Sequence, residues 1–290
     1  MVEKMRISTQ TESPERLRYT VDSLLEPGVG RMNEDALFIR EGQCGVFDGA
    51  SSLNGYTDDD GRTGGYLASH ILQETFAHSD RGLVETFIMA NRAIAEAMSK
   101  KGIDASQKEN TWSSTMAVIA IDEVQKKFEW IQMADALIIV IKKDGTYEVL
   151  ITDDYDHDRK TLMLWKEMAD QGVTDIRAKI NDTLITLRRT ANIEYGTVNG
   201  DPNAERFLRK GVGSLEGITH ILLFTDGMIP PKKDPNAQDD FTELVSWFQE
   251  GGLTKVKERI REREGSDPNC REYPRYKKSD DIGALAVCFE

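Results

Sequence analysis

Apolar residues recur with two different periods along this chain, and the period changes from one block to the next. Around residues 63–78 and 83–100 they return every three or four positions, which predicts two successive amphipathic helices. Thr63 can cap the first of these helices, and Gly102 ends the second. Four more segments have helical spacing, and they cover 158–171, 175–191, 241–249 and 254–264.

Short strand-like segments stand in blocks between these helices. Asp144-Gly145 is a strong hairpin signal, and residues 41–43 form a second turn. The segment 196–217 contains glycine and asparagine and is interpreted as irregular. The predicted strands are 16–25, 36–40, 44–47, 114–121, 127–133, 136–142, 147–151, 218–224 and 282–289. Because consecutive strands joined by short turns pair antiparallel, we expect an α+β fold of two packed antiparallel sheets flanked by helices.

Composition narrows the class of protein. The chain has 290 residues, of which 39% are hydrophobic and 30% charged, as expected of a globular protein. Its formal net charge of −13 argues against a general affinity for nucleic acid or for an anionic membrane. Three scattered cysteines without a CxxC pair, and an N-terminus without the apolar core of a signal peptide, predict a cytoplasmic protein.

Aspartates stand at the ends of several predicted strands. Asp48 and Asp226 each follow an apolar run and precede a glycine, although Asp-Gly is also an ordinary turn. Asp135 lies between two apolar strands, and Asp280 and Asp281 open the last strand. Carboxylates that converge at the rim of a sheet repel one another unless cations lie between them. Oxygen ligands suit hard ions such as Mg²⁺ or Mn²⁺, so we expect a metal-dependent hydrolase that acts on phosphate.

Seven short segments extend this pattern over nearly the whole chain. They are Asn33-Glu34-Asp35, Val46-Phe47-Asp48-Gly49, Ser113-Ser114-Thr115-Met116-Ala117, Ala134-Asp135-Ala136, Thr152-Asp153-Asp154, Thr225-Asp226-Gly227 and Asp280-Asp281-Ile282. In this order they resemble the motifs of the PPM or PP2C family of metal-dependent protein serine/threonine phosphatases, bacterial members included. The resemblance implies a four-layer αββα sandwich, with residues 1–15 as an extension, 16–290 as the phosphatase domain and a flap-like insertion at about 158–217.

The resemblance also implies two Mn²⁺ or Mg²⁺ ions, with a third and weaker one beside them. Hydroxide that bridges the two main ions would attack phosphorus in line, and Asp48, Asp226 and Arg31 would carry the catalysis. The implied metal-site residues are Asp48 as the bridge, the carbonyl of Gly49, Asp226 and Asp280 on the second ion, Glu34 and Asp35 beside bound waters, and Asp135 at the third ion.

The chain departs from the family pattern around the expected phosphate. Ala50 stands where many eukaryotic members have a histidine that is a proposed general acid. Arg31, the expected phosphate ligand, lies three residues before Glu34 rather than the usual four. Arg62 or Arg18 could bind the phosphate in its place.

Two further departures affect the expected metal ligands. Alanines flank Asp135 where the family has glycine and serine, and Asp281 replaces the usual asparagine. Either Asp280 or Asp281 could therefore face the metal, and the register favours Asp280. The adjacent basic pair Lys277-Lys278 is interpreted as a solvated surface.

We therefore expect a cytoplasmic enzyme that hydrolyses phosphoserine or phosphothreonine, with a phosphorylated protein as its partner and no role for nucleic acid or membrane. One alternative is a pseudophosphatase that binds phosphoproteins without turnover, which Ala50 and the shifted Arg31 favour. The other is a phosphatase of small molecules. The sequence leaves the physiological substrate and the oligomeric state open.

Overall fold

Two five-stranded antiparallel sheets form the centre of the protein in a computed structural model, which describes residues 17–50, 53–151 and 157–290. The first sheet has the order β1-β10-β9-β6-β7, with β1 (Tyr19–Glu26), β6 (Leu137–Lys142), β7 (Tyr147–Val149), β9 (Ile218–Phe224) and β10 (Ile282–Phe289). The second has the order β2-β3-β4-β5-β8, with β2 (Ala36–Arg40), β3 (Gln43–Ala50), β4 (Ser113–Asp122), β5 (Lys127–Met133) and β8 (Arg209–Ser214).

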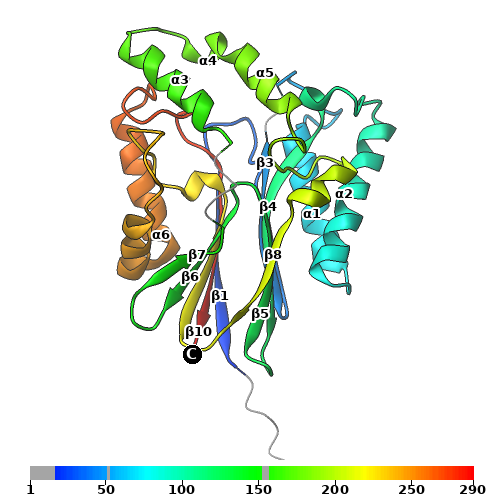
Figure 1. Ribbon diagram of the computed structural model, residues 1–290, viewed down its shortest axis with the longest axis vertical. Helices are drawn as coiled ribbons and strands as arrows, with labels where there is room; N and C mark the ends of the chain where they lie inside the picture. Colours follow the sequence, from blue (N-terminus) through cyan, green and yellow to red (C-terminus); the bar gives the residue numbers. More distant parts are fainter. Residues whose placement is uncertain (1–16, 51–52, 152–156) are drawn as a thin grey trace, which may run out of the picture.

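Helices cover the outer faces of both sheets (Figure 1). The helices α1 (Gly64–His78) and α2 (Leu83–Lys100) pack on the second sheet, and α6 (Thr242–Ser266) packs on the first. The layer between the sheets is filled by aliphatic side chains such as Val46, Ile138 and Leu223, all fully shielded from solvent. The predicted α+β sandwich with four layers is thus confirmed.

A third group of helices lies across one end of the two sheets (Figure 1). It consists of α3 (Arg159–Asp170), α4 (Ile176–Lys179) and α5 (Asn181–Arg189). The indole of Trp165 packs with Ile180 and Leu184 and donates a hydrogen bond to the carbonyl of Cys270 at 2.7 Å. This group, which we call the flap, is therefore joined to the loop that precedes β10. The described 3-10 turns are η1 (Lys108–Asn110), η2 (Pro202–Phe207) and η3 (Asp226–Met228).

One strand was not predicted from the sequence. The segment 196–217 was expected to be irregular, but β8 lies within it and pairs with β5 along the edge of the second sheet. Its glycines are required by close packing rather than by a turn. A Cβ at Gly211 would come within 2.7 Å of the Trp130 ring, and one at Gly213 within 2.3 Å of the Phe128 ring.

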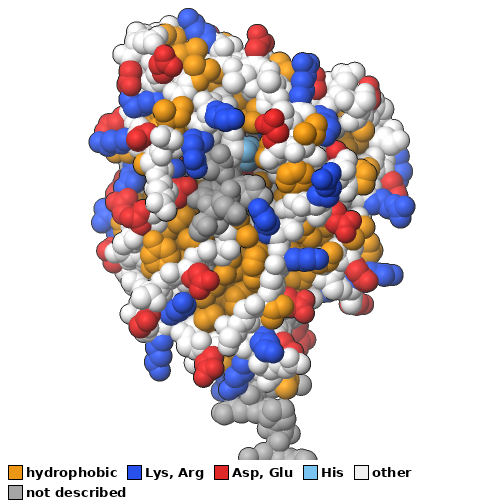
Figure 2. Space-filling model, viewed as in Figure 1, with side chains coloured by type: hydrophobic (Ala, Val, Ile, Leu, Met, Phe, Trp, Pro, Cys, Tyr) orange, Lys and Arg blue, Asp and Glu red, His pale blue; other side chains and the backbone are white. Residues whose placement is uncertain are grey.

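The surface and the helices agree with the composition. Acidic and basic side chains are interspersed on the face shown in Figure 2, despite the net charge of −13. In the described part of the chain, no helix combines the length and apolar character that crossing a membrane requires.

Candidate metal centre and active site

Strand ends from both sheets bring aspartates to the end of the sandwich below the flap. Asp48 lies near the end of β3, opposite Thr115 of β4, and Asp226 follows β9 as the first residue of η3. Asp280 immediately precedes the start of β10. Asp135 lies in the turn between β5 and β6, where Ala134 has a positive φ of 56°. These four carboxylates thus come from four separate segments of the chain.

The two Asp-Gly pairs are more than turns, because both glycines lie where another backbone passes very close. A Cβ at Gly49 would come within 2.4 Å of the carbonyl oxygen of Gly65. One at Gly227 would come within 1.8 Å of the carbonyl oxygen of Asp281. Only glycine fits at either position, so the backbone beside each aspartate is closely held.

The carboxylates of this cluster raise one another's pKa. For Asp48, Asp226 and Asp35, desolvation is the largest cause, and the negative charges of neighbouring aspartates add to it. A hydrogen bond from the hydroxyl of Thr225 to Asp35, at 2.7 Å, acts in the opposite direction. Desolvation likewise raises the pKa of Asp135. Each group would ionise more readily beside a cation, as expected of a metal-binding set.

Lys277 lies within this acidic cluster. Its Nζ pairs with Asp280 Oδ1 at 2.5 Å. Burial acts to lower the pKa of Lys277, but the charges of Asp280, Asp226 and Asp48 raise it overall. The interpretation of the Lys277-Lys278 pair as a solvated surface is therefore wrong for Lys277, whereas Lys278 is exposed. A sequence pattern of two adjacent lysines gives no indication that one turns inward.

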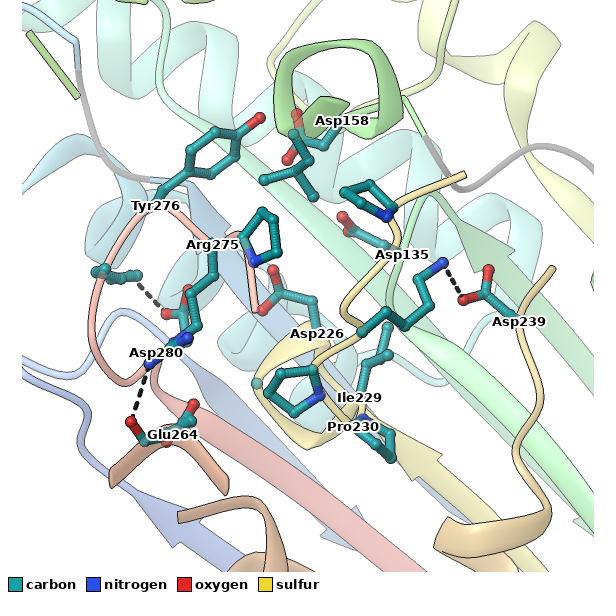
Figure 3. A pocket seen from close by; sticks show the side chains of 17 residues that line it. Asp135, Asp158, Asp226, Ile229, Pro230, Asp239, Glu264, Arg275, Tyr276 and Asp280 are labelled. Atoms are coloured by element: carbon teal, nitrogen blue, oxygen red, sulfur yellow. Dashed lines mark hydrogen bonds and ion pairs between the residues drawn. The ribbon is translucent and has the colours of Figure 1, made fainter. Parts of the chain in front are cut away.

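Two cavities meet at the cluster. The larger, of about 300 Å³, lies between the ends of β3 and β4 and the flap. The smaller, of about 170 Å³, is lined by Arg275 and Tyr276 and by Ile229 and Pro230 (Figure 3). Both are lined by Asp135, Asp158, Asp226, Tyr276, Lys277 and Asp280. Asp135, Asp226 and Asp280 therefore face both cavities, whereas Asp48 faces only the larger one.

Asp280 and Asp281 have different surroundings. Asp280 lines both cavities. Asp281 is only 4% exposed, and its carboxylate accepts hydrogen bonds from the backbone N–H groups of Gly28 at 2.7 Å and Glu34 at 2.8 Å. Asp281 therefore holds the first motif against β10, and this arrangement supports Asp280 as the residue that faces the metal.

Glu34 and Asp35 lie in the interior next to the cluster, and neither is among the described residues that line the two cavities. Both are buried, and the Glu34 carboxylate accepts a short hydrogen bond from the Thr63 hydroxyl at the start of α1. The carbonyl of Glu34 accepts hydrogen bonds from Gly49 N and from the Ser69 hydroxyl. The first motif is thereby tied directly to the second.

The two expected phosphate ligands lie elsewhere in the structure. Arg31 is exposed, and Arg62 pairs with Asp58 and Asp60 at 2.8 and 2.6 Å. Among the described residues that line the two cavities, neither arginine is present. The basic residues that do line the larger cavity are Arg177, Arg188, His157 and Lys277, none of which the sequence singled out as a site residue. Residues 152–154 of the fifth family motif lie outside the described residues.

The donor set fits a hard divalent cation. All the candidate ligands offer oxygen, and Asp135 Oδ1 is buried without a hydrogen-bond partner among the described residues. Thr115 Oγ1, in the larger cavity, is likewise buried without a hydrogen-bond partner among the described residues. No three acidic, histidine or cysteine side chains in the described ranges already share one coordination point. Like charges repel, and Lys277 lies among them, so the carboxylates would have to turn inward to bind an ion.

Comparison with known proteins identifies relatives of this chain and of its fold. The family model for protein phosphatase 2C matches residues 28–262. Among solved structures, the serine/threonine phosphatase Stp1 from Staphylococcus aureus aligns with a TM-score of 0.58 and 14% identity over 100% of both chains. The phosphatase PstP/Ppp from Mycobacterium tuberculosis gives a TM-score of 0.56 and 17% identity over 95% of this chain and 100% of that one.

Two other structures carry ligands. The PstP catalytic domain, solved with two manganese ions, has a TM-score of 0.54 and 16% identity over 94% of this chain and 98% of that one. MsPP from Mycobacterium smegmatis, solved with cacodylate, has the same TM-score and 18% identity over 95% and 99%. No curated protein matches the chain in sequence. Because the family model spans well over half of the residues, the chain belongs to the protein phosphatase 2C family.

Proposed function

We propose that this protein is a metal-dependent phosphatase that removes phosphate from phosphoserine and phosphothreonine in proteins. The observation that carries the proposal is the convergence of Asp48, Asp226 and Asp280 from three strand ends at one open cavity, in a chain that belongs to this family. Three aspartates that line one cavity favour divalent cations over other cofactors. The manganese ions of the similar PstP domain support Mn²⁺ or Mg²⁺ as the ions.

The residues of the cluster would divide the work between them. Asp48, the Gly49 carbonyl, Asp226 and Asp280 would hold the cations, and Asp135 would hold a third. When bound, the cations activate water for attack on phosphorus and offset the charge that develops on the phosphate. Glu34 and Asp35 have backbone and side-chain hydrogen bonds that keep their carboxylates fixed beside the site, where they can orient water. Asp281 would hold the segment that contains Gly28 and Glu34 against the start of β10 through two backbone hydrogen bonds.

The open shape of the site favours a protein substrate. The two cavities lie side by side at the carboxylates, so a phosphorylated side chain could enter one while neighbouring residues of its chain occupy the other. We take residues 16–290 as one phosphatase domain and the helices α3–α5 as its flap. The free thiols of Cys44, Cys270 and Cys288 suit a cytoplasmic enzyme.

Hydrolysis of p-nitrophenyl phosphate by the purified full chain tests the proposal. We expect turnover with Mn²⁺ or Mg²⁺ and none with EDTA. Asp48→Asn and Asp226→Asn should each abolish turnover while circular dichroism shows an intact fold. Absence of turnover in the folded wild-type protein with every metal would favour a phosphoprotein-binding pseudoenzyme. Faster hydrolysis of sugar or nucleotide phosphates than of phosphopeptides would favour a small-molecule phosphatase.

A further inference from the structure

The flap places an arginine above the catalytic cluster. Arg188, in the last turn of α5, lines the larger cavity together with Asp48, Asp226 and Asp280. Its Nη1 donates a hydrogen bond to the hydroxyl of Ser113, the first residue of β4, at 2.9 Å. The guanidinium is thereby fixed at the end of the second sheet, on the side of the cavity that faces the flap.

The register of β3 and β4 shows where Ser113, the partner of this guanidinium, lies relative to Asp48. Ser113 pairs with Ala50, and Thr115 pairs with Asp48. Side chains two residues apart on a strand point to the same face and are separated by about 6–7 Å along it. Ser113, which holds Arg188, is therefore on the same face as Asp48, and the spacing of about 6–7 Å between the two positions leaves room for a phosphate group. The small side chain of Ala50 leaves this space open.

Two arginines of the larger cavity, Arg177 and Arg188, have no carboxylate partner among the described residues, and Arg188 is the one held at the end of the second sheet. The hydroxyl of Ser113 is uncharged and so does not neutralise Arg188, and no carboxylate among the described residues pairs with this arginine. By contrast, the adjacent Arg189 pairs with Glu109 at 2.6 Å, outside the cavity, and Lys277 pairs with Asp280. A half-buried guanidinium without an anion keeps several planar N–H donors free, and these match the oxygens of a phosphate group.

We propose that Arg188 binds the phosphate of the substrate, so that the flap supplies the anion-binding group of this active site. Arg177, the second flap arginine in the cavity wall, would add positive charge behind it. This inference rests on the proposed function, because it assigns the phosphate ligand of that same reaction. It also gives the flap a direct part in substrate binding, since a phosphate held by Arg188 would link α5 to the ends of β3 and β4.

Kinetics of three variants with a phosphopeptide and Mn²⁺ test the assignment. We expect Arg188→Ala to raise KM at least tenfold and to raise the inhibition constant of inorganic phosphate in parallel. Arg188→Lys should recover part of this loss, because it keeps the charge without the planar pair of donors. Arg189→Ala is the matched control, since it removes the same group from the neighbouring position and should leave both constants within twofold of wild type.

A third readout separates phosphate binding from damage to the metal site. The dissociation constant of Mn²⁺, measured by calorimetry on each variant, should be unchanged in Arg188→Ala. The proposal is overturned if Arg188→Ala leaves KM and phosphate inhibition unchanged, or if Arg31→Ala alone produces both effects. An inactive wild-type protein would instead overturn the proposed function, and in that case calorimetry with inorganic phosphate and Mn²⁺ would still show whether Arg188 binds the anion.

Discussion

Asp280 and Asp281 are adjacent and both carry a carboxylate, but their surroundings give them different roles. Asp281 accepts two backbone N–H groups in a buried position, whereas Asp280 lies at the cavities beside Lys277. An asparagine at 281 could accept only one of the two N–H groups, because its amide nitrogen is a donor. The other N–H, of Gly28 or Glu34, would be left without a partner.

We therefore expect Asp281→Asn to reduce the free energy of unfolding by ~1–3 kcal/mol, the usual cost of an unsatisfied buried donor. Its affinity for Mn²⁺ should change little. Asp280→Asn should instead lower the affinity for Mn²⁺ at least tenfold without a comparable loss of stability. Urea unfolding and calorimetric titration of the two variants measure both quantities. A greater loss of metal affinity in Asp281→Asn would make Asp281 the ligand.

Lys277 places a positive charge where a divalent cation is expected to bind. Its ammonium pairs with Asp280 and interacts with the charges of Asp226 and Asp48, so it opposes an incoming ion and offsets carboxylate repulsion before one binds. We expect Lys277→Met to tighten Mn²⁺ binding about tenfold, equivalent to ~1.4 kcal/mol. In EDTA, the same variant should melt at a lower temperature than wild type.

Calorimetric titration with Mn²⁺ measures the first effect and differential scanning calorimetry the second. Lys278→Met is the control, because Lys278 is exposed and lies one residue further along the same loop. Equal Mn²⁺ affinity in wild type and Lys277→Met would mean that the ammonium moves out of the cluster at no cost.

At the scale of single elements, α6 shows how two glycines shape a helix. Residues 241–249 and 254–264 were predicted as separate helices, and the structure has one segment whose helical geometry is interrupted at Gly251 and Gly252. Gly252 has a φ of +68°, which side chains other than glycine rarely adopt. The interruption lets both halves of α6 bury apolar residues such as Phe248 and Ile260 on the first sheet.

Gly252→Ala should therefore destabilise the protein by ~1–2 kcal/mol, because alanine is strained at this φ. Gly265→Ala is a matched test near the end of the same helix, where φ is not positive and a Cβ would meet no atom within 4 Å. We expect it to be neutral or to stabilise by up to about 1 kcal/mol through better helix propensity. Chemical denaturation of the two variants compares them, and equal effects would argue against backbone strain at Gly252.

How well an element could be predicted depended on where its apolar residues pack. The helices α1 and α2 bury one face on the second sheet, and their predicted bounds agree with the structure. The strand β8 lies at a sheet edge with little buried surface, and its glycines serve the rings of Trp130 and Phe128, which are distant in sequence. The local pattern of apolar residues does not indicate a packing partner that is distant in sequence.

The same limit applies to the candidate site. The aspartates could be selected because they stand next to apolar strands, whose ends meet at a sheet rim. Arg188 and Lys277 lie in polar segments without such a pattern, and only the packing of the flap and of the loop before β10 brings them to the carboxylates. The basic side chains of this site are therefore positioned by tertiary contacts, such as the hydrogen bond from Arg188 to Ser113.

For the molecule as a whole, the acidic cluster links stability to pH and to metal. Asp35, Asp48 and Asp226 have pKa values raised well above the usual 3.8, so the folded state holds protons that the unfolded chain has already lost. Stability then falls as pH rises from the ordinary aspartate pKa through the raised values. Asp267 acts in the opposite sense and at lower pH. Although burial raises its pKa, hydrogen bonds from Tyr273, Arg271 and Arg275 lower it overall, and its contribution is lost as pH falls below 3.8.

In EDTA, we therefore expect the melting temperature to be highest near about pH 5 and to decrease toward about pH 8. Saturating Mn²⁺ should raise the melting temperature most at about pH 8, because the ion binds the ionised carboxylates and removes the cost of keeping them together. Scanning calorimetry across this range measures both curves. Asp48→Asn in EDTA should show a smaller decrease with pH, since it has one fewer carboxylate to ionise. The contrary result is a melting temperature in EDTA that rises steadily from about pH 5 to about pH 8 and is unaffected by Asp48→Asn. It would mean that the acidic cluster does not govern stability. The repulsion between carboxylates that Lys277 is expected to offset would then be absent as well.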